Sequence, residues 1–254
     1  MSLQKYGWRR QLPDFRDYKF KDIVGTLLPL QNVYLFGTHN TPAVYDQGQL
    51  GSCTGNGTGG AYQFQLMNET GIVSFEPSRL AIYYYARVPE GTTSTDAGAT
   101  IKDAIQGVIT YGVCPESVWP YDITKFADEP SAQAQAAMLK HKGLRYYNVD
   151  NTDKTLLVNA LLQGHPVVFG FTVYESFESQ VVADTGIVPM PGPNEQILGG
   201  HCCDIWAYNA DEDYFLCRNS WGIGWGKNGY FHMPAAYLTD PNLAADFWVL
   251  RTVS

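Results

Sequence analysis

Cys53 is the residue whose surroundings most clearly predict chemistry. It follows the glycine-rich turn 47–52 and begins a predicted helix over residues 53–67. A cysteine attacks as its thiolate, and the free N–H groups at a helix N-terminus lower a thiol pKa because they favour negative charge. Across the turn, the side-chain amide of Gln47 can join the Cys53 backbone N–H in donating to a developing oxyanion. This turn therefore predicts a nucleophile with an oxyanion-binding group beside it.

A nucleophilic thiol needs a base and a group that orients the base, and the second half of the chain offers both. His201 follows two glycines on a predicted strand over residues 197–208, and Asn219 ends the next predicted strand, over 214–219. The Asn219 side-chain carbonyl can accept the imidazole N–H and fix the ring, while Trp221 can exclude water from that hydrogen bond. Together these residues predict acyl transfer through a thioester, with no metal or cofactor.

Two motifs accompany this order of cysteine, histidine and asparagine. They are Gln47-Gly-x-x-Gly-Ser-Cys53 and Asn219-Ser-Trp-Gly, the second with a following Gly-x-x-Gly-Tyr. From about Pro42 to its end, the sequence thus resembles the papain-like cysteine peptidases. Residues 6–18 and 111–121 look more like the bacterial, archaeal and viral branch of that family.

The resemblance implies a role for each matched residue. A cysteine endopeptidase would use Cys53 as nucleophile, His201 as base, Asn219 as orienting residue and Gln47 as oxyanion donor. The residues expected to bind a peptide or protein substrate are Gly98 and Ala99 along its backbone, Gly170 and Cys202 in the main specificity pocket, and Trp221 on the primed side, beyond the scissile bond.

The elements that must position these residues change character along the chain. Hydrophobic periodicity predicts helices over residues 53–67, 77–86, 101–111, 132–141 and 155–163. Dense apolar runs then predict strands over residues 166–174, 197–208, 214–219, 229–233 and 246–252. Helices followed by strands indicate an α+β fold with two lobes rather than a doubly wound parallel sheet.

The first of these helices carries four glycines between residues 55 and 60. Each glycine costs about 1 kcal/mol relative to alanine inside a helix, so tertiary packing must hold this one. We expect the small residues to let the helix pass close to other backbone.

The resemblance implies a papain-like fold, with a mainly helical lobe packed against an antiparallel β-barrel-like lobe and the active-site cleft between them. We expect an N-terminal extension over residues 1–27 and a catalytic domain over 28–254, with residues 45–145 in the helical lobe and 146–254 in the β lobe. The extension has no evident core role and is too short for a helical propeptide. Our hypothesis is that it lies across the cleft and holds the enzyme latent; a purely structural arm is the alternative.

The acidic composition argues against nucleic acid as a partner, since the formal net charge is −8 and the pI is about 5.0. No apolar run is long enough to span a membrane, and residues 1–10 lack the apolar stretch of a signal peptide. The five cysteines form no C-x-x-C pair, and Leu50 stands where many papain-like relatives have a disulfide cysteine. We therefore expect free thiols in a cytoplasmic protein, or in a secreted one if a signal peptide has been removed.

Two other functions are compatible with these residues. An amidase, transpeptidase or peptide ligase could use the same triad, and the products formed from a peptide library would separate these activities. A non-catalytic binding module could keep the fold, although the complete set of Cys53, His201, Asn219 and Gln47 argues against it. Labelling of Cys53 by an epoxide or vinyl sulfone would distinguish a catalyst from such a module.

Overall fold

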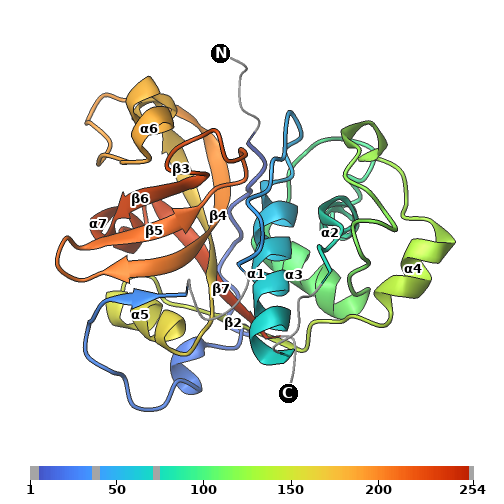
Figure 1. The fold of residues 1–254 in the computed structure, drawn as a ribbon, viewed down its shortest axis with the longest axis horizontal. Coiled ribbons are helices and arrows are strands. Elements are labelled where there is room, and N and C mark those ends of the chain that lie inside the picture. Colours follow the sequence, from blue (N-terminus) through green and yellow to red (C-terminus); the bar gives the residue numbers. More distant parts are fainter. Residues whose placement is uncertain (1–5, 36–40, 71–74, 252–254) are drawn as a thin grey trace.

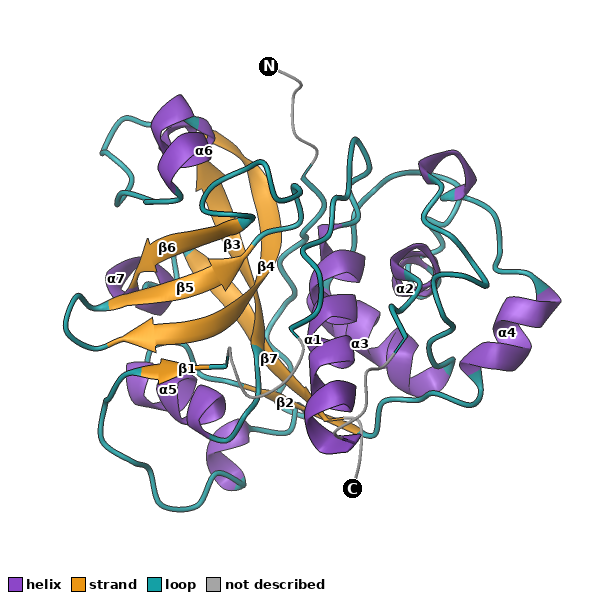
Figure 2. Cartoon of the chain, viewed as in Figure 1, coloured by secondary structure: helices purple, strands orange, loops and turns teal. Residues whose placement is uncertain are grey.

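The computed structural model describes residues 6–35, 41–70 and 75–251, and its two lobes meet along helix α1 and strand β4 (Figure 1). The helical lobe contains α1 (Cys53–Thr70), α2 (Arg79–Arg87), α3 (Ile101–Thr110) and α4 (Ala132–Met138). The other lobe is an antiparallel sheet with helices α5 (Lys154–Leu162), α6 (Gln180–Thr185) and α7 (Ala235–Thr239) (Figure 2). This arrangement confirms the predicted α+β fold with two lobes.

The sheet places the strand that carries His201 at its centre. Its order is β2 (Arg145–Asn148), β7 (Ala244–Arg251), β3 (Val167–Tyr174), β4 (Ile197–Asn209), β5 (Tyr214–Arg218) and β6 (Tyr230–Pro234). The short strand β1 (Val33–Tyr34) pairs with the end of β4 that extends past β3. In the ranges that the structure describes, the edge strands β2 and β6 pair with one strand each, so the barrel-like sheet remains open.

Strands β3 and β4 are buried on both faces because the two lobes pack together across them. Val168 and Cys202 belong to the core of the helical lobe, whereas their neighbours Phe169 and Cys203 belong to the core of the sheet lobe. Successive side chains of a strand point to opposite faces, so the adjacent cysteines serve different cores. All five cysteines are free, buried thiols.

Helix α1 continues through its glycines because other elements pack directly on them. A Cβ added to Gly55 would lie 2.8 Å from the carbonyl oxygen of Arg79, and one added to Gly60 would lie 2.5 Å from the guanidinium of Arg218. The prediction that small residues let this helix pass close to other backbone is confirmed. The contacts of its glycines also determine how closely the N-terminus of α1 packs against β4.

Several helices begin where a side chain caps them. Ser78, Thr100 and Ser131 each accept a hydrogen bond from the backbone N–H three residues later. Each cap lies within two residues of the predicted start of its helix. In the part of the chain described, no helix is both long and apolar enough to cross a bilayer.

The sequence analysis missed the shorter elements β1, β2, α6 and α7. Helix α6 is only six residues long, although Ser179 caps its start and Gly186 ends it in the left-handed conformation. Strand β2 begins at Arg145 and pairs with β7, so this strand starts one residue before the predicted lobe boundary. The strand predicted over 246–252 is β7, and residue 252 lies outside the described residues.

The N-terminal arm, residues 6–27, runs between the lobes and then onto the sheet lobe (Figure 1); residues 1–5 of the predicted extension lie outside the described residues. Phe20 is fully buried and Val24 nearly so, both in the core of the sheet lobe. The expectation that the extension has no core role is therefore wrong for its second half. Its first half, from Tyr6 to Gln11, lies where the predicted active site is.

Candidate active site

Cys53 begins helix α1, and its side chain is fully buried. Burial raises the pKa of its thiol from an ordinary 9.0 to about 11, because the charged form loses solvation. Hydrogen bonds from the backbone of Cys202, Gly7 and Thr54 act in the opposite direction but do not overcome the burial. The thiol is therefore neutral while the arm is in place. Both β4, the strand of His201, and the arm contact it.

His201 lies on β4 and is held by Asn219, which directly follows β5. The imidazole Nε2 lies 2.8 Å from the Asn219 Oδ1, which also accepts the Ser220 backbone N–H at 2.8 Å. Because that oxygen can only accept, Nε2 carries the proton and Nδ1 is the basic nitrogen of the neutral ring. Within the described part of the chain, Nδ1 has no hydrogen-bond partner.

The ring of Trp221 covers the imidazole, with its centroid 4.9 Å from that of His201 and the planes 30° apart. Burial lowers the pKa of His201 to about 4, although the hydrogen bond to Asn219 raises it in part. The predicted base is thus a neutral imidazole, fixed in orientation and shielded from water. Its free Nδ1 is available to a proton donor once the cleft opens.

Gln47 is fastened to the residue that follows Asn219, which ties the two lobes together. Its backbone N–H donates to the Ser220 carbonyl at 2.8 Å, and its Oε1 accepts from the Ser220 hydroxyl at 2.6 Å. The amide Nε2 donates to the Leu50 carbonyl at 2.9 Å. This amide lies at the turn before Cys53, where the predicted oxyanion donor is expected.

Gly98 and Ala99, predicted to pair with substrate backbone, pair with the arm instead. The Ala99 N–H donates to the Gly7 carbonyl at 2.8 Å, and its carbonyl accepts from the Arg9 N–H at 3.0 Å. A Cβ on Gly98 would collide with the Gly7 carbonyl. The arm is an extended chain in the groove, and its pairing with Ala99 is parallel.

Gly170 and Cys202, predicted to line the main specificity pocket, surround the side chain of Trp8. A Cβ on Gly170 would collide with the indole ring, and Cys202 belongs to the same apolar cluster as Trp8. The Trp8 backbone N–H donates to the Gly200 carbonyl at 3.0 Å, on the residue before His201. The arm therefore fills this pocket with an aromatic side chain.

On the other side of Cys53, Tyr6 lies at the position predicted to bind the primed part of a substrate. Its ring centroid lies 6.4 Å from that of Trp221 and 6.2 Å from that of His201. Its hydroxyl donates to the carboxylate of Glu178. Seven of the nine residues singled out by the sequence analysis thus lie against the arm, while Asn219 bonds to His201 and Gln47 to Ser220. The arm contacts this set on both sides of the thiol.

Three residues of this cleft escaped the sequence analysis. Ser220 lies inside the Asn219-Ser-Trp-Gly motif, so the motif itself was a signal for it. Glu178 lies in the 3-10 helix η3 (Glu175–Glu178), which carries no motif. Asp246 contacts Trp8 and is an acidic residue inside an apolar strand, a pattern that calls for an explanation.

Comparisons with known proteins agree with this geometry. The family model described as papain family cysteine protease matches residues 37–243. A peptidase C1-like protein of Acanthamoeba polyphaga mimivirus is 44% identical over 216 residues, which cover 82% of this chain and 70% of that protein. Cysteine proteinase 3 of Dictyostelium discoideum is 29% identical and is covered over 54% of its length.

Two solved structures extend the comparison to the arm. Xylellain, a cysteine protease from Xylella fastidiosa, superposes with a TM-score of 0.88 at 35% identity, over 100% of this chain and 99% of that one. Procathepsin L 3 of Tenebrio molitor larval midgut gives a TM-score of 0.73 at 19% identity and 76% coverage of its chain, a likeness of fold alone.

Proposed function

This chain belongs to the papain family of cysteine proteases, and on that premise we propose that it is a cysteine endopeptidase whose own N-terminal arm holds it latent. The observation that carries the proposal is the His201 imidazole, fixed by Asn219 through Nε2 and left with an unbonded Nδ1 on the strand that reaches the Cys53 thiol. A structural histidine would instead have both nitrogens satisfied.

The proposed reaction uses each of these groups once the arm has left the cleft. His201 Nδ1 takes the proton of the Cys53 thiol, and the sulfur attacks the peptide carbonyl carbon. Gln47 and the Cys53 backbone N–H donate to the oxyanion that forms. The imidazolium then protonates the leaving amine, and water attacks the thioester with His201 as base, which returns the free thiol.

Latency is supported by the direction in which the arm crosses the cleft. Tyr6 lies on the primed side beside Trp221, whereas Trp8 lies in the pocket of Gly170 and Cys202. A substrate would place its N-terminal part in that pocket and its C-terminal part beside Trp221. The arm therefore runs opposite to a substrate and blocks both sides without offering Cys53 a correctly oriented peptide bond.

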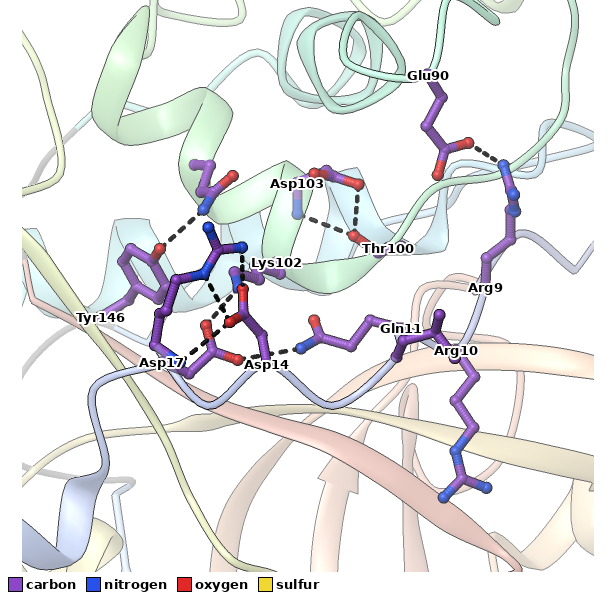
Figure 3. A pocket seen from close by; sticks show the side chains of 13 residues that line it. Arg9, Arg10, Gln11, Asp14, Asp17, Glu90, Thr100, Lys102, Asp103 and Tyr146 are labelled. Atoms are coloured by element: carbon purple, nitrogen blue, oxygen red, sulfur yellow. Dashed lines mark hydrogen bonds and ion pairs between the residues drawn. The ribbon is translucent and has the colours of Figure 1, made fainter.

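The arm is also fastened outside the cleft. Lys102 of α3 forms ion pairs with Asp14 and Asp17 (Figure 3). Asp14 pairs with Arg16 as well. Beyond these pairs, Phe20 anchors the arm in the core of the sheet lobe. Removing residues 1–27 would therefore expose that core, so latency is better tested by a substitution inside the cleft.

A labelling experiment tests both parts of the proposal. Cys53 should react with a peptidyl epoxide faster in the full-length Trp8→Ala variant than in the unmodified chain, and Cys53→Ala should lose both the label and peptide hydrolysis. Products from a peptide library, with and without an added amine nucleophile, would separate hydrolysis from peptide transfer. Absence of Cys53 labelling in folded Trp8→Ala protein would reject the catalytic proposal, whereas equal labelling of both chains would reject latency alone.

A further inference from the structure

The turn that precedes Cys53 carries the predicted oxyanion donors, and one hydroxyl group contacts both of its ends. Gln47 begins this turn, and Ser52 ends it just before the Cys53 backbone N–H. The Tyr121 hydroxyl donates to the Gln47 backbone carbonyl at 3.0 Å and also shares a hydrogen bond with the Ser52 hydroxyl. One oxygen atom therefore links the two residues whose separation sets the distance between the donors.

The direction of these hydrogen bonds follows from their partners. The Gln47 carbonyl can only accept, so Tyr121 donates to it and the Ser52 hydroxyl donates to Tyr121. The Ser52 oxygen accepts in turn from the Asn56 side-chain amide at 3.1 Å. Burial raises the pKa of the Tyr121 hydroxyl, so its proton is retained. A chain of hydrogen bonds thus runs from α1 through Ser52 and Tyr121 to the start of the turn.

The ring of Tyr121 is held in place by charged groups of the helical lobe. The Arg79 guanidinium carbon lies 4.3 Å from the Tyr121 ring centroid, and one of its nitrogens lies 3.2 Å from the Asn56 side-chain oxygen. The Glu116 Oε1 accepts the Tyr121 backbone N–H and also pairs with Arg79 at 3.4 Å. The guanidinium and the carboxylate therefore fix the direction from which the hydroxyl meets the turn.

The sheet lobe holds the same turn from the opposite side. The Gln47 backbone N–H and side-chain oxygen are both bonded to Ser220. Gln47 is thus held between Ser220 of one lobe and Tyr121 of the other. An oxyanion donor acts only within hydrogen-bond distance of the position where negative charge develops. A small shift of this turn therefore weakens the stabilisation of the transition state while it leaves the thiol intact.

We infer that Tyr121 is a positioning residue for the proposed reaction, and that its hydroxyl keeps the Gln47 amide and the Cys53 N–H at the spacing that the oxyanion requires. It acts through the turn rather than on the substrate. Residues 111–121, which the sequence analysis singled out, end at this tyrosine, so the last residue of that segment acquires a role in catalysis. The inference rests on the proposed endopeptidase activity and adds a residue to its mechanism.

The test removes the hydroxyl in full-length Trp8→Ala protein, in which the cleft is open under the proposed latency. Tyr121→Phe keeps the ring against Arg79. We expect kcat for a peptide substrate to fall roughly tenfold with KM unchanged, since complete loss of an oxyanion donor costs roughly 100- to 1000-fold. Exchange of the Cys53 thiol with a dipyridyl disulfide should keep its rate, because sulfur attacks sulfur, a pyridine thiolate leaves and no oxyanion forms. A disturbed fold or thiol would slow both reactions.

Two more variants complete the test. Ser52→Ala breaks the same chain of hydrogen bonds and should also lower kcat without slowing disulfide exchange. The double variant should lose little more activity than Tyr121→Phe alone, because the two hydroxyls act as one unit. Tyr237→Phe is the matched control, since its hydroxyl also donates to a backbone carbonyl, that of Thr172 at 2.6 Å, but lies in the sheet lobe away from the turn. Its kcat should not change.

The inference is overturned if Tyr121→Phe leaves kcat unchanged, or if disulfide exchange slows as much as hydrolysis. If Tyr121→Phe protein does not fold, an unchanged kcat in Ser52→Ala overturns it instead. Failure of the Trp8→Ala parent to cleave any peptide, with Cys53 unlabelled by the peptidyl epoxide, would reject the proposed function and this inference with it.

Discussion

At Cys53, burial and hydrogen bonding move the pKa of the thiol in opposite directions, and burial dominates while the arm is in place. The same burial lowers the pKa of His201 to about 4. Between these two values both groups are neutral, so under the proposed latency the arm suppresses the thiolate as well as blocking access. Opening the cleft restores water to both side chains and shifts both pKa values back toward their ordinary range.

Trp8→Ala should therefore change the pH dependence of Cys53 alkylation by iodoacetamide. The thiol pKa falls when the cleft opens, so the reactive thiolate appears at lower pH. A fall from about 11 to its ordinary 9.0 would raise the thiolate fraction at a pH below both values roughly 100-fold. The measurement is the alkylation rate against pH in both full-length chains, and coincident profiles would contradict the expected role of the arm.

Asn219→Ala should reduce turnover without abolishing folding. The imidazole would lose the acceptor that fixes its Nε2, a hydrogen bond of about 1.5–3 kcal/mol when the ring is charged, so kcat should fall roughly 10- to 100-fold. KM should change little, because Asn219 is buried behind His201 and Trp221. Steady-state kinetics in the Trp8→Ala background measures both, and an unchanged kcat would remove Asn219 from the proposed mechanism.

Helix α1 delivers Cys53 to β4 only because its glycines leave room for the elements packed on it. Asp204 and Arg218, on β4 and β5, lie directly under Gly60. Both side chains are buried, and burial raises the pKa of Asp204 to about 8 even though the Arg218 charge lowers it. The position of the catalytic helix thus depends on polar side chains that cannot easily move aside.

Gly60→Ala should destabilise the protein although alanine favours a helix. Its Cβ would lie 2.5 Å from the Arg218 guanidinium and 2.9 Å from the Asp204 carboxylate. Overpacking of this kind costs about 1–3 kcal/mol. Gly59→Ala is the control, because its Cβ would make ordinary contacts of 3.4 and 3.5 Å and gain up to about 1 kcal/mol of helix propensity. Urea denaturation measures both, and equal stabilities would disprove the packing argument.

The long elements could be predicted from the sequence because their periodicity and caps agree with the packing that forms. The catalytic set was also predictable, since motifs mark Cys53, Gln47 and Asn219 directly. The roles of those residues remain predictions until activity is measured. Asp246 and the path of the arm were not predictable, because a bulge in β7 and a tertiary contact decide them, and neither leaves a local pattern in the sequence.

In the whole molecule, the arm is bound by both lobes and by two kinds of interaction. Trp8 is held by apolar contacts in the cleft, whereas Asp14 and Asp17 are held by Lys102 beside a pocket of about 740 Å³ at the surface (Figure 3). Salt weakens these partly buried ion pairs only in part, and it affects apolar contacts little. The two halves of the attachment should therefore respond differently to ionic strength.

Lys102→Gln should release part of the attachment and speed the labelling of Cys53 in the full-length chain. Salt should speed labelling of the unmodified protein by a smaller factor, because the ion pairs are partly buried, and it should have little effect on the variant, which lacks them. Lys125→Gln serves as the control, since Lys125 pairs with Asp122 away from the arm. Labelling rates across a salt series would measure this, and a variant as slow as the unmodified chain would show that the ion pairs do not hold the arm.

The parallel pairing of the arm with Ala99 has a consequence for how activity first arises in a population of molecules. The docked segment from Tyr6 to Gln11 crosses the cleft in the direction opposite to a substrate, so no molecule can cleave its own segment while that segment stays in the cleft. The first cuts must fall on a second molecule whose segment from Tyr6 to Gln11 has left its cleft. Peptide hydrolysis by freshly purified protein should therefore begin after a lag that shortens as protein concentration rises. The rate should then increase as each activated molecule cleaves the segment of others.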